Sequence, residues 1–146
     1  VEVTTSPKGV TIGISSDISF ESGSATTKPG FVEILKKIVP TIEESYFMIA
    51  VEGHTDSDPL PKNLRIKYPS NWELSGARAS AVVRLLIDLK VDPVRLQSVG
   101  YGEFVPRDKN TAEIITADLI QKYNSTPQQK SRNRRVEITF LAPNEL

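Results

Sequence analysis

The chain is most informative where it reads Tyr68-Pro69-Ser70-Asn71-Trp72-Glu73-Leu74-Ser75-Gly76-Ala77-Arg78-Ala79. Ser70 and Glu73 form a capping box, which predicts a helix that begins at Ser70 and ends near Lys90. Positions i, i+3, i+4 and i+7 lie on one face of a helix, and here they are Asn71, Leu74, Ser75 and Arg78. An arginine on a largely apolar face costs free energy unless a partner pairs with its charge, so the pattern indicates a binding pocket.

A second motif, Gly53-His54-Thr55-Asp56, precedes this helix. The continuous apolar run Tyr46–Val51 before the motif predicts a buried central strand, so Asp56 lies close to where that strand ends. Asp56 and Arg78 are therefore candidate charged groups of one pocket. Two simpler interpretations stay open. Asp56 could be a turn residue that accepts a backbone hydrogen bond, and Arg78 could be a structural arginine, or pair with Asp56 without a ligand.

The other predicted elements alternate between strands and helices. Alternation of apolar and polar residues predicts strands at 1–5 and 10–20, which form a hairpin around the turn 6–9, and at 96–101 and 136–140. Helical spacing predicts helices at 29–39, ended by Pro40, and at 111–123, with a short helical turn at 92–93. Loops are expected at 57–69 and 124–131. This order predicts an α/β fold, a two-layer sandwich with helices packed on one face of a sheet.

The composition is that of a single globular domain. The 146 residues suffice for one core, and 38% of them are hydrophobic while 25% are charged. Lys and Arg number 18, as do Asp and Glu, so the zero net charge gives no long-range attraction to nucleic acid. No cysteine is present, which excludes disulfides and cysteine-ligated zinc. Because the chain begins with Val1 and has no apolar run of about 18 residues, we expect a processed or excised fragment.

Three sharper interpretations of the motifs are weak. His54, Asp56 and Asp58 have the alternate spacing of a metal site, but Asp58 precedes a proline in the loop and no second ligand cluster follows. The basic segment 130–135 lacks the interleaved aromatic residues of a nucleic-acid site. A hydrolase would need a second carboxylate or a metal beside Asp56. We therefore expect no catalysis, no cofactor, no metal and no nucleic-acid partner.

In combination, four motifs resemble those of the OmpA-like peptidoglycan-associated domain over roughly residues 10–141. They are Gly53-His54-Thr55-Asp56, Asn71-x-x-Leu74-Ser75-x-x-Arg78-Ala79, Gly100-Tyr101-Gly102 and Asn133-Arg134-Arg135-Val136-Glu137. Segments 20–25 and 68–75 and the long loop between Asp56 and Asn71 further resemble the periplasmic domain of a flagellar motor stator B subunit (MotB or PomB type). The resemblance implies an OmpA-C-like fold with a mixed sheet. It also implies that residues 1–9 are a linker or hairpin strand and that residues 10–146 are a single peptidoglycan-binding domain.

The resemblance also implies a binding site. In the family, the aspartate of the Thr-Asp pair and the arginine of the Leu-Ser-x-x-Arg-Ala motif grip the diaminopimelate residue of the peptidoglycan stem peptide. These positions are Asp56 and Arg78. The chemistry agrees, because a carboxylate suits the ammonium of diaminopimelate and a guanidinium binds a carboxylate bidentately. The expected site is completed by Asn71, Thr55 and Arg135.

Simpler roles stay open for three residues near this site. Asn71 could serve only the first turn of the helix, and Arg135 could be a solvated strand residue. Trp72 is expected to pack against the protein rather than to stack on a sugar. The loop at 57–70 is longer than in the general family and carries Lys62, Arg65 and Lys67, so we expect it to cover or reshape the pocket.

The resemblance implies a periplasmic domain of an inner-membrane protein, which anchors a flagellar stator to the cell wall. The expected partners are peptidoglycan, a second copy of the chain, and the stator A subunit with its ion channel, reached through a membrane segment absent from this sequence. The alternative is a general peptidoglycan-associated envelope module, such as a lipoprotein or the tail of an outer-membrane protein. A further alternative is that binding requires residues 1–5 to rearrange first.

Overall fold

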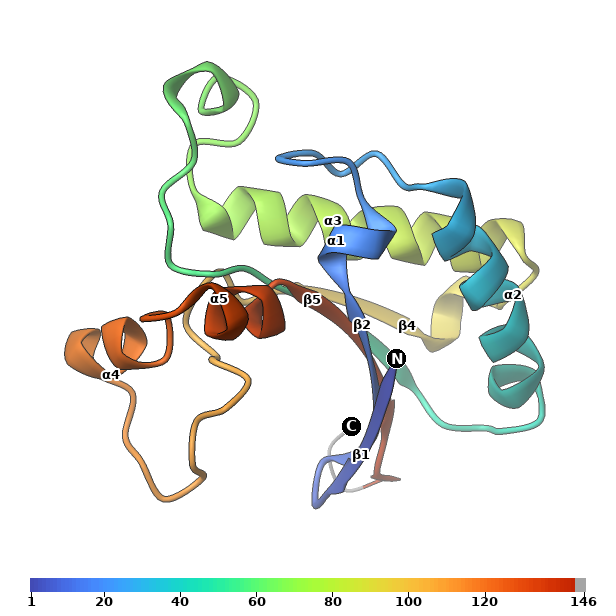
Figure 1. The fold of residues 1–146 in the computed structure, drawn as a ribbon. Coiled ribbons are helices and arrows are strands. Elements are labelled where there is room, and N and C mark those ends of the chain that lie inside the picture. Colours follow the sequence, from blue (N-terminus) through green and yellow to red (C-terminus); the bar gives the residue numbers. More distant parts are fainter. Residues whose placement is uncertain (144–146) are drawn as a thin grey trace.

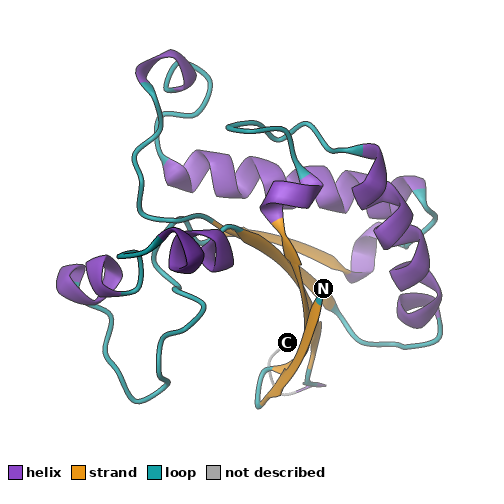
Figure 2. Ribbon diagram, viewed as in Figure 1, coloured by secondary structure: helices purple, strands orange, loops and turns teal. Residues whose placement is uncertain are grey.

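The computed structural model describes residues 1–143 and shows a five-stranded mixed sheet with two long helices against one face (Figures 1 and 2). The strands are β1 (Glu2–Ser6), β2 (Gly9–Ser15), β3 (Ile49–His54), β4 (Leu96–Gly100) and β5 (Arg135–Leu141). Their spatial order is β1-β2-β5-β3-β4, in which β3 and β4 are parallel and the other neighbours are antiparallel. The predicted hairpin and α/β sandwich are confirmed. The last three residues of the predicted domain, 144–146, lie outside the described residues.

The long helices are α2 (Pro29–Glu43) and α3 (Asn71–Asp88), and both lie on the same face of the sheet (Figure 1). The short helical segments are α1 (Ser16–Ser19), η1 (Lys62–Leu64), η2 (Pro93–Arg95), α4 (Ala117–Lys122) and α5 (Pro127–Asn133). The last two lie beside the end of the sheet at which β5 begins, and the loop that carries η1 extends away from the sheet at the start of α3 (Figure 1).

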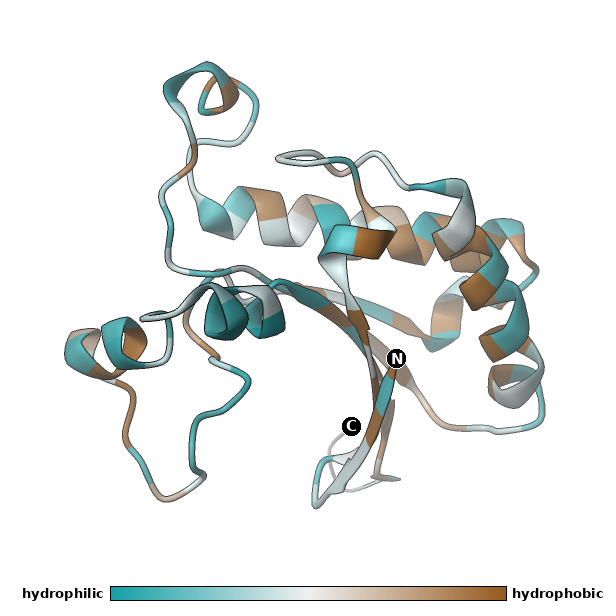
Figure 3. Ribbon diagram, viewed as in Figure 1, coloured by the Kyte–Doolittle hydropathy of each residue, from teal (hydrophilic) through white to brown (hydrophobic). Residues whose placement is uncertain are grey.

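The hydrophobic core fills the space between the sheet and these two long helices. Hydrophobic residues recur along α2 and α3 (Figure 3). The buried side chains of the core include Ile14, Phe20, Phe31, Leu35, Ile42, Ile49, Val51, Val82, Leu86, Val136 and Ile138. Each large apolar side chain of this kind contributes about 1.5–3 kcal/mol when it is fully buried.

Glycines let α3 approach the sheet closely. A Cβ atom on Gly53 of β3 would collide with the carbonyl oxygen of Ser75, and one on Gly100 of β4 would lie 2.5 Å from the backbone nitrogen of Gly76. The Ser75 hydroxyl also accepts a hydrogen bond of 3.0 Å from the backbone N–H of Gly102, just beyond β4. The helix that carries Arg78 is thus fixed directly on the two strands beside Asp56.

Two predicted boundaries near the N-terminus are wrong. The strand expected at 10–20 ends at Ser15, because the Ser15 hydroxyl accepts a hydrogen bond from the backbone N–H of Asp17 and begins α1. The helix expected to end before Pro40 continues to Glu43. Proline lacks a backbone N–H, so this position loses one helical hydrogen bond, but a proline so near the C-terminus does not stop the last turn.

The segment before β5 also differs from its prediction. Only 117–122 of the helix expected at 111–123 forms, and it begins where the Thr116 hydroxyl accepts a hydrogen bond from the N–H of Leu119. Residues 127–131 of the loop expected at 124–131 belong to α5, which continues to Asn133. Thr126 and Gln129 form a capping box at its start, and Pro127 occupies the first turn. These helix-start signals were present in the sequence. In the segment of α5 they favour a helix more strongly than the polar composition favours a loop.

Candidate functional site

A cavity of about 240 Å³ lies between the loop after β3, the first two turns of α3 and the loop after α1. Four of the five predicted site residues line it: Thr55, Asp56, Asn71 and Arg78. Arg135 does not line it, and its neighbour Arg134 does. The cavity therefore brings together the predicted carboxylate of Asp56, the predicted guanidinium of Arg78, and two further charged groups, on Asp58 and Arg134.

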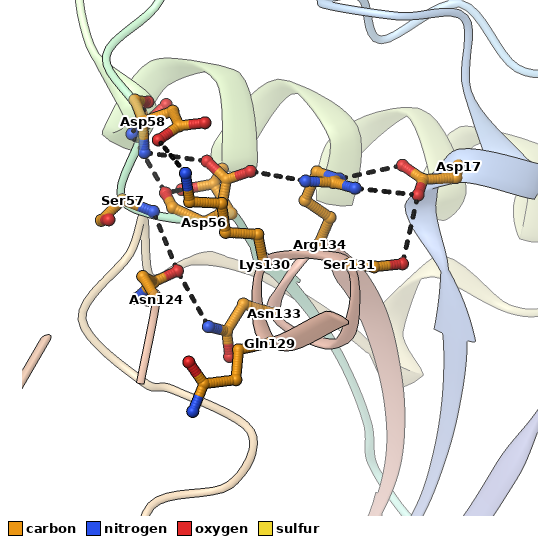
Figure 4. A network of polar contacts seen from close by, with 12 residues as sticks. Asp17, Asp56, Ser57, Asp58, Asn124, Gln129, Lys130, Ser131, Asn133 and Arg134 are labelled. Atoms are coloured by element: carbon orange, nitrogen blue, oxygen red, sulfur yellow. Dashed lines mark hydrogen bonds and ion pairs between the residues drawn. The ribbon is translucent and has the colours of Figure 1, made fainter. Parts of the chain in front are cut away.

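Asp56 is held by an arginine and by its own loop (Figure 4). One carboxylate oxygen, Oδ2, lies 2.7 Å from Nη1 of Arg134, and the other, Oδ1, accepts a 2.9 Å hydrogen bond from the backbone N–H of Asp58. The Asp56 carboxylate therefore accepts a backbone hydrogen bond within its own turn, which is the simpler interpretation of this residue. The structure shows no direct ion pair between Asp56 and Arg78 in the described chain, although both groups face the same cavity.

Arg78 is a buried cation that lines the cavity. Its Nε donates a 2.8 Å hydrogen bond to the carbonyl oxygen of Ser24, and its guanidinium lies 5.0 Å from the centre of the Phe20 ring. Among residues 1–143, no acceptor bonds to Nη1 or Nη2. Burial lowers the pKa of the Arg78 guanidinium, although the charge of Asp17 acts in the opposite direction. The terminal nitrogens of this cavity-lining arginine are therefore available to an anionic group.

Asn71 and Thr55 hold the loop that carries Asp56. The Nδ2 group of Asn71 donates hydrogen bonds of 3.3 Å and 3.1 Å to the carbonyl oxygens of Asp56 and Asp58. The backbone N–H of Thr55 donates to the carbonyl oxygen of Gly102 at 2.9 Å, and its hydroxyl donates to the carbonyl oxygen of Asp56 at 2.8 Å. Both side chains are buried, so they position the carboxylate as well as line the cavity.

Arg134 joins the loop after β3 to α1. Besides its contact with Asp56, it donates from Nε and Nη2 to the two carboxylate oxygens of Asp17 at 3.0 Å and 3.1 Å (Figure 4). The hydrogen bond to Asp17 raises the pKa of Arg134, and the same contact lowers the pKa of Asp17. Sequence reasoning missed both residues, because nothing local connects position 17 with position 134.

The prediction that Arg135 belongs to the site does not match the geometry. Successive strand residues point to opposite faces, so a shift of one residue decides which arginine reaches the cavity. Arg135 is the first residue of β5 and lies opposite His54. Its guanidinium lies 3.2 Å from the Glu137 carboxylate and donates to the carbonyl oxygen of Val105 at 3.0 Å. Arg134 precedes the strand and turns toward Asp56 instead.

A buried pair of asparagines ties α5 to the same loop. Asn133 donates a 2.9 Å hydrogen bond to Oδ1 of Asn124, which also accepts one of 3.2 Å from the backbone N–H of Ser57 (Figure 4). Both asparagines are almost fully buried. They were not predicted as site residues, although Asn133 stands beside the two arginines in the motif that the sequence offered.

His54 belongs to a different polar cluster, on the far side of β3. Its Nε2 lies 3.1 Å from Oε1 of Glu137 without the alignment of a hydrogen bond, and its ring stacks on Tyr101 at a centroid distance of 5.2 Å. Burial would raise the pKa of Glu137, but His54 and the charge of Arg135 outweigh it and lower this pKa to about 2. Over residues 1–143, no three histidine, cysteine or acidic side chains are grouped for a metal.

The long loop covers the cavity, as expected from its length. Pro59, Leu60, Pro61 and Leu64 line one wall. Gly23 has a positive φ of 62° and lies in the loop after α1, where a Cβ atom would contact the end of the Leu64 side chain. The two loops therefore meet over the space between Asp56 and Arg78.

Comparisons with known proteins identify the family and the fold of the chain. A family profile described as "OmpA family" matches residues 19–134. Motility protein B of Bacillus subtilis is 32% identical over 143 residues, which are 97% of this chain and 48% of that protein. The chain thus spans about half the length of this relative.

Two solved structures have the same fold. The cell wall anchor of the T6SS from Pseudomonas aeruginosa has a TM-score of 0.77 at 30% identity, covering 97% of this chain and 87% of that one. The periplasmic domain of Helicobacter pylori MotB (residues 78–256) has a TM-score of 0.77 at 25% identity, covering 97% and 81%. Within the described residues, no helix combines the length and the apolar character needed to cross a membrane.

Proposed function

The chain belongs to the OmpA family, and on this basis we propose that it is a non-catalytic domain that binds peptidoglycan and anchors an envelope complex to the cell wall. Residues 10–146 would form this domain, with residues 1–9 as a linker and first hairpin strand. The observation that carries the proposal is the buried Arg78, which lines the same cavity as Asp56 and whose terminal nitrogens have no acceptor among the described residues. Such a group is costly in an empty pocket and is explained by an anionic ligand.

The ligand that fits this arrangement is the diaminopimelate residue of a stem peptide. Its free end carries an ammonium and a carboxylate on one carbon, and the cavity offers a carboxylate and a guanidinium. Arg78 would bind the ligand carboxylate with two parallel hydrogen bonds, and Asp56 would accept from the ammonium. Asn71 and Thr55 would hold the Asp56 loop in place, and Arg134, rather than Arg135, would orient the Asp56 carboxylate.

The finer proposal is that the anchored complex is a flagellar stator. It is supported by the similarity to Motility protein B along nearly the whole chain and by the shared fold with the MotB periplasmic domain. The domain would then act in the periplasm as part of an inner-membrane protein and would work as a homodimer. Its partners would be the stator A subunit and the ion channel that the two subunits form.

A second candidate is the wall anchor of another envelope machine. The observation that favours it is the T6SS cell wall anchor structure, which is 30% identical and covers nearly the whole chain. Both candidates use the same pocket. They differ in the segment that precedes the domain in the full-length protein, so the gene sequence upstream of Val1 would distinguish them.

The test is co-sedimentation with purified peptidoglycan sacculi. We expect the wild-type chain to sediment with sacculi, and Asp56→Asn and Arg78→Lys to remain mostly in the supernatant. Tyr46→Ala is the matched control, because Tyr46 is fully exposed and precedes β3 at the opposite end from the cavity. Equal sedimentation of all four proteins would overturn the assignment of the pocket, and release of sugar or peptide products would show that the domain is an enzyme.

A further inference from the structure

A second hollow lies beside the cavity at the start of α3. It measures about 420 Å³ and shares Pro59, Leu60 and Asn71 with the first cavity. Its distinguishing feature is an aromatic pair, Trp72 and Phe104. A ligand that extends out of the first cavity past Asn71 would therefore meet these two rings next.

The two rings form an exposed platform. They stack with centroids 4.9 Å apart and an angle of 19° between their planes. Trp72 is 50% exposed and Phe104 is 39% exposed, although aromatic residues of this size usually bury most of their surface. Packing between the rings thus accounts for one face of the pair and leaves a large apolar surface in water.

The platform is fixed to the same elements as the cavity. Trp72 lies in the first turn of α3, six residues before Arg78. Phe104 follows a turn in which its backbone N–H donates to the carbonyl oxygen of Tyr101, and Gly102 of this turn bonds to both Ser75 and Thr55. The distance between the aromatic pair and the Asp56 loop is therefore set by backbone contacts.

Polar groups without protein partners border the platform. The Glu103 carboxylate makes no ion pair or hydrogen bond within residues 1–143, although it lines the hollow. Arg65 uses its Nε to bond the carbonyl oxygen of Leu60 at 2.8 Å, and no acceptor in that range bonds to its terminal nitrogens. An aromatic surface with free acceptors and donors at its edge suits a sugar, because the C–H face of the ring packs on the aromatic surface while hydroxyl and acetamido groups bond the edge.

We propose that Trp72 and Phe104 form a saccharide subsite, which binds the amino-sugar chain of the same ligand whose stem peptide occupies the cavity. The inference rests on the proposed function for the identity of the ligand. It departs from the simpler expectation that Trp72 only packs against the protein. The three lining residues that the two hollows share favour a sugar attached to the stem peptide over an unrelated partner.

The test compares two synthetic ligands by calorimetry and by fluorescence. One is a tripeptide that ends in diaminopimelate, and the other is the same tripeptide attached to a disaccharide of N-acetylglucosamine and N-acetylmuramic acid. We expect the disaccharide to tighten binding about tenfold in the wild-type chain, and Trp72→Ala to remove this gain while it leaves the tripeptide affinity unchanged. Trp72→Phe should retain most of the gain. Because Trp72 is the only tryptophan, its fluorescence should change with the disaccharide ligand and not with the tripeptide.

The outcomes separate the two proposals. If neither ligand binds the wild-type chain, the proposed function itself fails. If the tripeptide binds but the disaccharide adds nothing, or if Trp72→Ala keeps the full gain, the saccharide subsite is wrong and the pocket assignment stands. Tyr46→Ala removes an exposed aromatic residue elsewhere and should behave like the wild type, and equal melting temperatures would show that the variants fold.

Discussion

At the scale of single residues, the site depends on a cation that the protein itself does not neutralise. Arg78 is buried, and its only hydrogen bond to the described chain leaves from Nε, toward a carbonyl oxygen. Arg134, in contrast, forms ion pairs with two aspartates, Asp17 and Asp56, and so holds their two segments together. The two arginines that face the cavity therefore have different roles: Arg134 fixes Asp56, and Arg78 is kept available.

This difference predicts that Arg78→Met will weaken ligand binding strongly while it changes the free energy of unfolding little. Removing a buried charge without a partner relieves a desolvation cost, which offsets the lost contacts with Ser24 and Phe20, so the free energy of unfolding should stay within about 1 kcal/mol of wild type. Affinity for a diaminopimelate tripeptide should fall at least about 100-fold, because two charge-assisted hydrogen bonds are lost. Urea unfolding and calorimetry measure the two quantities. A loss of stability with unchanged affinity would make Arg78 a structural residue.

The cluster around His54 predicts a loss of stability in acid. Burial lowers the pKa of His54 below its ordinary value of 6.5, so the unfolded state takes up this proton first as the pH falls, and stability decreases below about pH 6.5. The pKa of Glu137 is about 2 in the folded protein against 4.5 ordinarily, so its contribution is present above pH 4.5 and is lost as the pH falls toward 2. Both effects have the same sign.

Urea unfolding at a series of pH values checks this prediction. His54→Gln should flatten the decrease that begins near pH 6.5. It should also reduce the decrease at lower pH without removing it, because His54 and Arg135 both lower the pKa of Glu137 and only Arg135 remains. A variant with the same pH profile as the wild type throughout would show that His54 is not the group that titrates.

The sequence predicted two of the charged residues that line the cavity, Asp56 and Arg78, but not the network that holds them. Asp56 and Arg78 stand in short motifs whose helical and strand positions can be counted. The choice between Arg134 and Arg135 depends on where β5 begins, and the pairing with Asp17 depends on strand order. Neither is encoded locally, because a change of one residue in register reverses which side chain faces the cavity.

At the scale of elements, the position of α3 decides the distance between Asp56 and Arg78. The helix rests on β3 and β4 through glycines, where backbone meets backbone. A side chain at either position would lift the helix from the sheet. The pocket geometry is thus a consequence of how closely one helix approaches two strands.

Two glycine variants test this point. Gly53→Ala should lower the free energy of unfolding by about 2–3 kcal/mol and weaken ligand binding, since the new methyl group collides with the Ser75 carbonyl group. Gly76→Ala is the matched control in the same contact region, where a Cβ atom meets nothing within 4 Å. It should raise stability by up to about 1 kcal/mol, because alanine favours a helix interior. Similar effects of the two substitutions on unfolding would contradict the close approach of α3.

Element types were predictable wherever periodicity was long and strong, as for α3 and the central strands. Errors occurred where a local signal competed with the pattern. The Ser15 cap ended β2 before the alternation of its side chains did, and Pro40 did not stop α2. The capping box of α5 formed a helix in a segment whose polar composition favoured a loop.

At the scale of the whole molecule, the hydrophobic core and the candidate binding site lie in different parts of the fold. The apolar face of the sheet and the two long helices form the core, while the loops after β3, β4 and α1 meet at one end to form the cavity and its extension. The five-stranded order itself could not be derived from the sequence, because β5 inserts between β2 and β3 from the far end of the chain. In the proposed anchor, the sheet would carry the load and the loops that it positions would bind the ligand.

The central claim is that Asp56 and Arg78 together form a preorganised site for the end of a stem peptide. Titration of the chain with a diaminopimelate tripeptide, followed by NMR of backbone amides and of arginine side chains, tests it most directly. We expect saturable shifts centred on Asp56, Asn71 and the Arg78 guanidinium, with little change at Tyr46 or in β1. A well-dispersed spectrum that does not change up to millimolar peptide, or shifts that centre elsewhere, would contradict the claim.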